Sequence, residues 1–84
     1  MPKVTIYTTP LCGYCQMAKR LLASKAVAFE EIDVSGDSAA REALIARSGR
    51  RTVPQIWIGD RHVGGFDDLY ALDRAGDLDA LLAA

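Results

Sequence analysis

Apolar and polar positions alternate in some segments of the chain and recur at helical spacing in others. Residues 3–8, KVTIYT, alternate Val4 and Ile6 with more polar neighbours, which predicts a strand. Residues 12–26 are rich in helix formers. Their apolar members share one face of a helix, namely Cys15, Ala18, Leu21 and Leu22. The chain therefore begins with a strand and an amphipathic helix.

The later segments continue this alternation of strands and helices. The pattern predicts a strand over 27–34, a helix over 38–49 that stops at Gly49, short strands over 54–59 and 61–65, a helix from Asp67 through Asp73, and a final turn over 78–84. The first two strands, joined by a helix, form a parallel unit, and the later hairpin adds antiparallel strands. We expect an α/β fold with a four-stranded mixed sheet and helices on both faces.

Composition limits the class of protein. Residues 1–84 fit one compact domain, and half of them are apolar while a quarter are charged, as in ordinary globular proteins. No stretch approaches the roughly 18 apolar residues that a membrane span requires, and residues 3–8 do not form the apolar core of a signal peptide. No dense basic stripe of the kind that binds nucleic acid is present. We expect a cytoplasmic protein that binds neither a membrane nor nucleic acid.

The only two cysteines, Cys12 and Cys15, lie three positions apart where a loop turns into a helix. This pair is compatible with a structural disulfide, half of a metal site, or a redox centre. A lasting disulfide is disfavoured in a reducing compartment. A closed zinc site needs four ligands, and the chain adds only His62 among the usual soft donors. A redox centre is thus favoured, while a metal shared between two chains stays open.

The expected helix start distinguishes the two thiols. Unpaired N–H groups and the positive end of the helix dipole stabilise an anion at Cys12, and the basic Lys19 and Arg20 follow. Such surroundings can lower a thiol pKa from about 8.5 to roughly 3.5–7.5. Cys15 lies one turn further on, on the apolar face. We assign Cys12 as the nucleophile and Cys15 as the resolving thiol, although the basic residues are equally compatible with an ordinary solvated face.

Three motifs, CGYC, TVP and GGFDDL, appear in this order at residues 12–15, 52–54 and 64–69. Together they resemble the glutaredoxin family, in particular its short bacterial dithiol members, and the resemblance covers essentially the whole chain. It implies a thioredoxin-like fold and a glutathione-dependent thiol–disulfide oxidoreductase. Such an enzyme reduces protein–glutathione mixed disulfides and protein disulfides, with glutathione as co-substrate and no tightly bound cofactor.

The resemblance also implies a site for glutathione. Val53, within Thr52-Val53-Pro54, would pair with the tripeptide as an added strand, with Pro54 cis and opposite the thiols. The helix that starts near Gly65, Phe66 and Asp67 would hold the glutamyl carboxylate, with an Asp on the ammonium. Arg51, with Arg50, would meet the glycyl carboxylate, and Tyr14 would line the groove.

Ordinary structural roles compete with several of these assignments. Asp67 and, more so, Asp68 can simply cap a helix, and Arg50 and Arg51 can be exposed arginines. Trp57 alternates with two isoleucines and is assigned to packing. His62 has no acidic or thiol neighbour in the sequence and receives no functional role.

Two positions depart from the family pattern. Thr9 stands where many members carry a lysine that contacts glutathione, and Arg51 is a candidate to compensate for it. Gly13 stands where proline is common between the thiols, which loosens the first turn of the helix.

Two further functions remain as alternatives. Some dithiol members with glycine between the thiols resemble cluster carriers, in which two chains and two glutathiones share a [2Fe-2S] centre through the first cysteine, here Cys12. A redoxin reduced by thioredoxin reductase is the other alternative. We expect a monomer that acts on glutathionylated or disulfide-containing proteins, with a cluster-bridged dimer as the alternative assembly.

Overall fold

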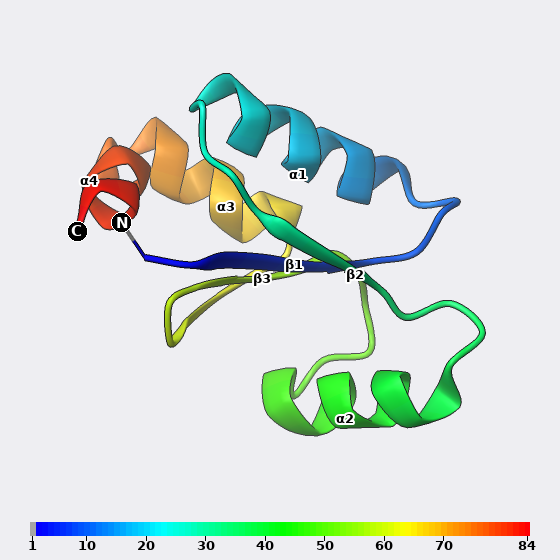
Figure 1. Cartoon of the computed structure of the whole chain (residues 1–84). Coiled ribbons are helices and arrows are strands. Elements are labelled where there is room, and N and C mark those ends of the chain that lie inside the picture. Colours follow the sequence, from blue (N-terminus) through cyan, green and yellow to red (C-terminus); the bar gives the residue numbers. More distant parts are fainter. Residues whose placement is uncertain (1) are drawn as a thin grey trace.

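The computed structural model describes residues 2–84 and contains alternating strands and helices (Figure 1). In chain order these are β1 (Val4–Thr8), α1 (Gly13–Ser24), β2 (Glu30–Asp33), α2 (Ser38–Ser48), β3 (Gln55–Ile58), β4 (Arg61–Gly64), α3 (Phe66–Arg74) and α4 (Asp77–Ala83). No helix among the described residues has the length and hydropathy needed to cross a membrane.

The strands form one mixed sheet in the order β2-β1-β3-β4. β1 pairs with β2 in parallel and with β3 in antiparallel, and β3 pairs with β4 across the predicted turn at Gly59 and Asp60. Helices α1 and α3 cover one face of the sheet, and α2 covers the other (Figure 1). The predicted thioredoxin-like α/β fold with helices on both faces is confirmed.

The alternation of side chains along β3 gives each face of the sheet its own core. Ile56 and Ile58 pack with residues of α1, α3 and α4 in the larger cluster. Trp57 points to the other face and packs with Val34 and Leu44 beneath α2. All four residues of β3 are buried, as expected for a central strand covered on both faces. The packing role predicted for Trp57 is consistent with this position.

Two element boundaries differ from the prediction. Lys25, Ala26 and Val27 direct their backbone N–H groups to carbonyl oxygens at the end of α1, so β2 starts only at Glu30. At the C-terminal end, Gly76 has a φ of 80° and separates α3 from α4. Residues 77–83 therefore form a helix of their own, where the sequence pattern predicted only a turn.

Candidate active site

The loop after β1 delivers Cys12 to the start of α1, where it is the N-cap residue. Its extended backbone (φ −116°, ψ 108°) lets Sγ accept the N–H of Cys15 at 3.1 Å. Gly13 follows as the first residue of the helix. Both thiols are free, Cys12 is half-buried and Cys15 is fully buried. The sulfur of Cys12 thus takes the place that an oxygen acceptor usually occupies at a helix N-terminus.

Burial gives the second thiol a different acidity. Desolvation of the charged form, and next the hydrogen bond with Cys12, raise the pKa of Cys15 to about 12. At neutral pH the protonated thiol therefore predominates at Cys15. This difference in surroundings supports the assignment of distinct roles to the two sulfurs.

The basic residues that precede β2 in the sequence meet acidic residues in the fold. Lys19 Nζ lies 2.9 Å from Glu31 Oε2, which also accepts the hydroxyl of Thr8 at 2.7 Å. These two contacts, Lys19 first, lower the pKa of Glu31. Lys25 pairs with acidic residues of α3 and α4. The charges of Lys19 and Lys25 are therefore paired with acidic residues, which a count along the sequence does not reveal.

Cys12 contacts the loop before β3 across a large sequence separation. Its Sγ donates to the carbonyl oxygen of Val53 at 3.6 Å, and the Val53–Pro54 peptide bond is cis. The cis form expected from the resemblance is thus present. The contact places the sulfur beside the backbone that leads into the central strand β3.

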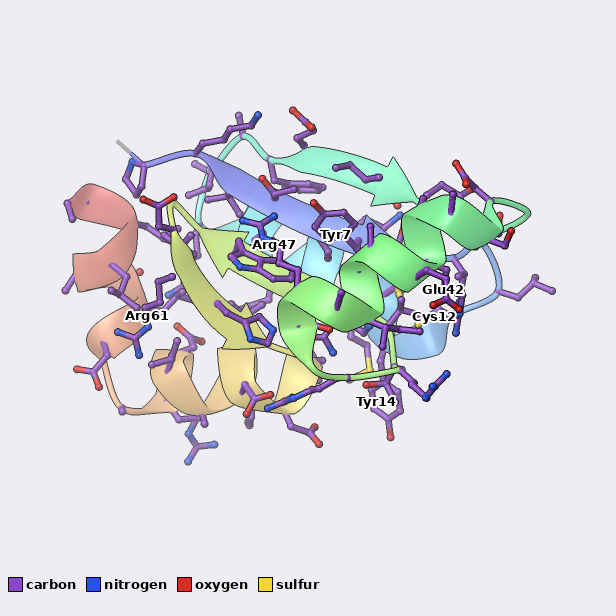
Figure 2. All side chains as sticks on the ribbon, turned by 90° about the horizontal axis from the view of Figure 1, so that it is seen from below. Tyr7, Cys12, Tyr14, Glu42, Arg47 and Arg61 are labelled. Carbon is purple, nitrogen blue, oxygen red and sulfur yellow. The ribbon has the colours of Figure 1, made fainter. Side chains whose placement is uncertain are left out.

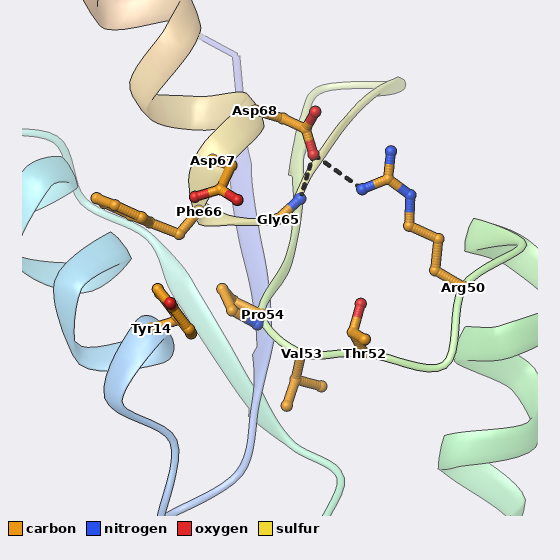
Figure 3. A pocket seen from close by; sticks show the side chains of 9 residues that line it. All are labelled: Tyr14, Arg50, Thr52, Val53, Pro54, Gly65, Phe66, Asp67 and Asp68. Carbon is orange, nitrogen blue, oxygen red and sulfur yellow. Dashed lines mark hydrogen bonds and ion pairs between the residues drawn. The ribbon is translucent and has the colours of Figure 1, made fainter.

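A groove of about 280 Å³ opens at this place (Figure 3). It is lined by Tyr14, Arg50, Thr52, Val53, Pro54, Gly65, Phe66, Asp67 and Asp68. The structure therefore brings together all the predicted binding residues except Arg51. Arg51 is exposed outside this lining, and its carbonyl oxygen accepts a hydrogen bond from Arg41 at 3.2 Å. Thr9 also lies outside the lining of the groove.

Aromatic rings form one wall of the groove. Tyr14 stacks on Phe66 with ring centroids 6.3 Å apart, and Phe66 stacks on Tyr70 at 5.8 Å. Tyr14 is well exposed, with 61% of its surface accessible. The wall joins the start of α1 to the start of α3 and gives this side of the groove an apolar surface (Figure 3).

A charged pair forms the opposite side (Figure 3). Asp68 Oδ2 accepts the N–H of Gly65 at 2.9 Å and the guanidinium of Arg50 at 2.8 Å. Arg50, and then Gly65, lower the pKa of Asp68. From sequence, Arg50 was named only together with Arg51 as a candidate for the glycyl carboxylate, and Asp68 was favoured as a helix cap. The signal for Asp68 was its place three residues after a helix N-cap, which is the acidic position of a capping box.

Among residues 2–84, the structure contains no group of three or more histidine, cysteine or acidic side chains arranged to hold a metal ion. What the described residues provide is a free thiol at a helix N-terminus, a buried second thiol one turn away, and a groove with apolar and charged sides.

Comparison with known proteins identifies this arrangement. The family model described as glutaredoxin matches residues 4–63. A glutaredoxin of Pseudomonas aeruginosa is 58% identical over 84 residues and covers 100% of both chains. The solution structure of glutaredoxin from Brucella melitensis is 56% identical with a TM-score of 0.88, covering 98% of this chain and 89% of that one.

A more distant structure is similar over the same length. The crystal structure of a buckwheat glutaredoxin–glutathione complex has a TM-score of 0.91 at 29% identity, and it covers 98% of this chain and 77% of that one. Fold, paired thiols and sequence relationship agree. The chain belongs to the glutaredoxin family of thiol–disulfide oxidoreductases.

Proposed function

We propose that the protein is a glutathione-dependent oxidoreductase of the cytoplasm that reduces protein–glutathione mixed disulfides and protein disulfides. The observation that carries the proposal is the position of Cys12 Sγ, 3.6 Å from the Val53 carbonyl oxygen at the side of the groove. A disulfide whose glutathione half occupied this groove would present a sulfur to Cys12.

For a protein–glutathione mixed disulfide, the thiolate of Cys12 attacks the glutathione sulfur. The new bond joins Cys12 to glutathione while the original S–S bond breaks, and the substrate protein leaves as a thiolate that takes up a proton. The thiolate of a second glutathione then attacks the bound glutathione sulfur. This step releases glutathione disulfide and returns the electron pair to Cys12 as thiolate.

For a protein disulfide, Cys15 resolves the intermediate. Cys12 first forms a mixed disulfide with one substrate sulfur, and the other substrate sulfur takes up a proton. Cys15 then attacks Sγ of Cys12, and its proton goes to the departing substrate sulfur. Two glutathiones reduce the resulting Cys12–Cys15 disulfide. Because Cys15 is buried and its pKa is high, it enters only after Cys12 has reacted.

The groove offers complementary groups to the tripeptide. We assign the backbone of Val53, within Thr52-Val53-Pro54, to pair with the ligand as an added strand. The N–H groups at the start of α3, from Gly65 through Asp67, would hold the glutamyl carboxylate, with the Asp67 carboxylate on the ammonium. Tyr14 and Phe66 would cover the apolar part.

The glycyl carboxylate remains assigned to Arg51. Arg50 lines the groove, but its guanidinium is already paired with Asp68 at 2.8 Å. Arg51 is the next residue and is exposed, outside the groove lining. A carboxylate reaching it would meet a cation with no competing ion pair of the kind that occupies Arg50.

The deciding experiment compares electron donors. With hydroxyethyl disulfide as substrate, turnover is measured with glutathione plus glutathione reductase and, separately, with thioredoxin reductase alone. We expect turnover only with glutathione. Turnover restricted to thioredoxin reductase would overturn the proposal in favour of the other redoxin class.

A Cys15→Ser variant tests whether Cys12 is the nucleophile and Cys15 the resolving thiol. It should retain reduction of a glutathionylated peptide while reduction of a protein disulfide weakens. Cys12→Ser should abolish both activities. Loss of both activities in the Cys15 variant as well would contradict the resolving role.

Visible absorbance after anaerobic purification tests the alternative of a [2Fe-2S] cluster bridged through Cys12.

A further inference from the structure

Beyond the residues that line the groove, we propose that Gln55 and His62 are positioning residues that fix Thr52 and thereby set the affinity for glutathione. The inference rests on the proposed function. Neither side chain is part of the groove lining. Gln55 acts from the α2 side of the sheet through hydrogen bonds to Thr52 at one edge of the groove, and His62 acts through its hydrogen bond with Gln55.

Gln55 is the contact that reaches the groove. Its side chain is fully buried, and its backbone belongs to β3, where it pairs with Tyr7 of the central strand β1. From this fixed base, Nε2 donates to the carbonyl oxygen of Thr52 at 3.1 Å and to its hydroxyl at 3.3 Å. Thr52 itself is exposed, so these bonds hold an exposed groove residue from the interior.

His62 determines which way the Gln55 amide points. Because the amide nitrogen faces two oxygens of Thr52, Oε1 faces His62, whose Nε2 lies 2.7 Å away. An amide oxygen can only accept, so His62 must carry a proton on Nε2. Without that donor, the amide could rotate and place its oxygen against the Thr52 carbonyl, where two acceptors repel each other.

The imidazole is itself held in place by the core. Its ring stacks on Trp57 with centroids 4.5 Å apart and an interplanar angle of 27°. Trp57 is 3% exposed, and the Arg47 guanidinium of α2 lies 4.2 Å from its ring centroid. Burial, and next the charge of Arg50, lower the pKa of His62. The neutral ring with its proton on Nε2 is therefore the form that orients Gln55 near neutral pH.

This arrangement predicts an effect on binding and not on the chemical step. A fixed Thr52 lowers the ordering cost that glutathione must overcome when it pairs with the adjacent Val53. The reacting sulfur of Cys12 contacts Val53 and Cys15 but neither of the positioning residues. Loss of the Gln55 orientation should thus raise KM and leave kcat unchanged.

The test replaces the donor while keeping the stacked ring. His62→Phe should raise KM for glutathione by about two- to tenfold, the range for one hydrogen bond, with kcat within error of the wild type. His62→Gln should restore most of the affinity, because its amide nitrogen lies as many bonds from the backbone as Nε2 of histidine. Val63→Ala is the control: it removes packing from the same strand β4 but against the larger cluster on the other face of the sheet, outside the groove lining, and should leave KM unchanged.

A second measurement examines the hydrogen bonds between Thr52, Gln55 and His62 in the absence of glutathione. Two-dimensional ¹⁵N–¹H correlation spectra of the neutral wild-type imidazole should show the proton on Nε2. A proton on Nδ1, or His62→Phe with the wild-type KM, would overturn the inference while leaving the proposed function intact. Equal KM increases in His62→Phe and Val63→Ala would also overturn it. A wild-type protein that does not use glutathione would overturn the proposed function and, with it, the inference.

Discussion

At the scale of single residues, chemically similar side chains of the candidate active site lie in different surroundings. Cys12 is half-buried and contacts the Val53 carbonyl, whereas Cys15 is fully buried in the first turn of α1. Arg50 is paired with Asp68, whereas Arg51 next to it is exposed outside the groove lining. Each contrast leads to a measurable difference.

The two thiols should react with iodoacetamide at very different rates in the native reduced protein. Cys15 has no exposed surface and a pKa of about 12, so at pH 7 it should stay unmodified while Cys12 is labelled. Peptide mapping by mass spectrometry distinguishes the sites, and labelling in urea is the control in which both react. Equal labelling of both sites in the native state would contradict the difference in environment.

Removing the exposed arginine should weaken binding without affecting folding. We expect Arg51→Ala to raise KM for glutathione several-fold, because one charge-assisted contact to the glycyl carboxylate is lost. The thermal midpoint should change little, since the side chain is exposed. Arg61→Ala, at an exposed position of β4 away from the groove lining, is the matched control. An unchanged KM in Arg51→Ala would remove Arg51 from the site.

At the scale of elements, the site depends on how α1 is attached to the sheet. Lys19 of α1, Glu31 of β2 and Thr8 of β1 meet at one carboxylate. At the C-cap of α1, Lys25 lies 2.7 Å from Asp73 and 3.1 Å from Asp79. These contacts attach the helix to its neighbours at its middle and at its C-terminal end.

Glu31→Gln should lower stability in a pH-dependent way. The folded-state pKa of Glu31 lies below its ordinary value of 4.5, so its ionised form stabilises the fold above that pH. This stabilisation is lost as pH falls through the folded-state pKa. The variant should therefore be less stable at pH 7, by about 0.2 to 1 kcal/mol, and match the wild type in strong acid.

Urea unfolding at several pH values measures this difference. Glu42→Gln, on an exposed position of α2 (Figure 2), is the control that should match the wild type throughout. A Glu31→Gln deficit that persists unchanged in strong acid would show that the carboxylate charge is not its source.

Sequence pattern predicted most elements because most follow a local period. The alternation in residues 3–8 and the capping and stop residues around α2 are local signals, and both elements appear where expected. The start of β2 and the existence of α4 depend on other segments. Residues 25–27 bond back to α1, and α4 is stabilised by packing of Leu78 and Leu82 against the core. The spacing of apolar residues along the sequence reveals neither set of contacts.

At the scale of the whole molecule, each face of the sheet packs against its own hydrophobic cluster. The cluster under α1, α3 and α4 is the larger core. The cluster under α2 contains Trp57, on which His62 stacks, and Figure 2 shows Arg47 and Tyr7 meeting on that side. The groove lies between segments that these two cores support.

Leu78→Ala tests the contribution of α4. Leu78 is fully buried, so its truncation should lower the free energy of unfolding by about 2 to 5 kcal/mol. Since α4 supplies no residue to the groove lining, KM of the folded variant should equal that of the wild type. Leu81→Ala, at a half-buried position, should lower the free energy of unfolding by less. Urea unfolding measures the loss of stability, and turnover of the same preparations measures KM. A changed KM in Leu78→Ala would contradict the expectation that α4 affects stability without affecting the groove.

The site was predictable to the extent that it follows motifs. The motifs CGYC, TVP and GGFDDL contain every residue that lines the groove except Arg50, while Arg51, which was predicted for the site, lies outside the lining. The pairing of Arg50 with Asp68 and the bonds from Gln55 to Thr52 and His62 were not predictable. They depend on side-chain directions across strands β3 and β4 and the start of α3, which spacing along the chain does not specify.

The hydrogen bond from Cys12 to Val53 spans 41 residues of sequence. A shortened chain that ended before Val53 would keep both sulfurs and the helix that carries them, yet it would lose the acceptor, the groove and the central strand. Truncation to a point before Val53 therefore cannot yield a minimal enzyme, and moving the thiol motif alone into another protein would carry over the two sulfurs without the groove beside them.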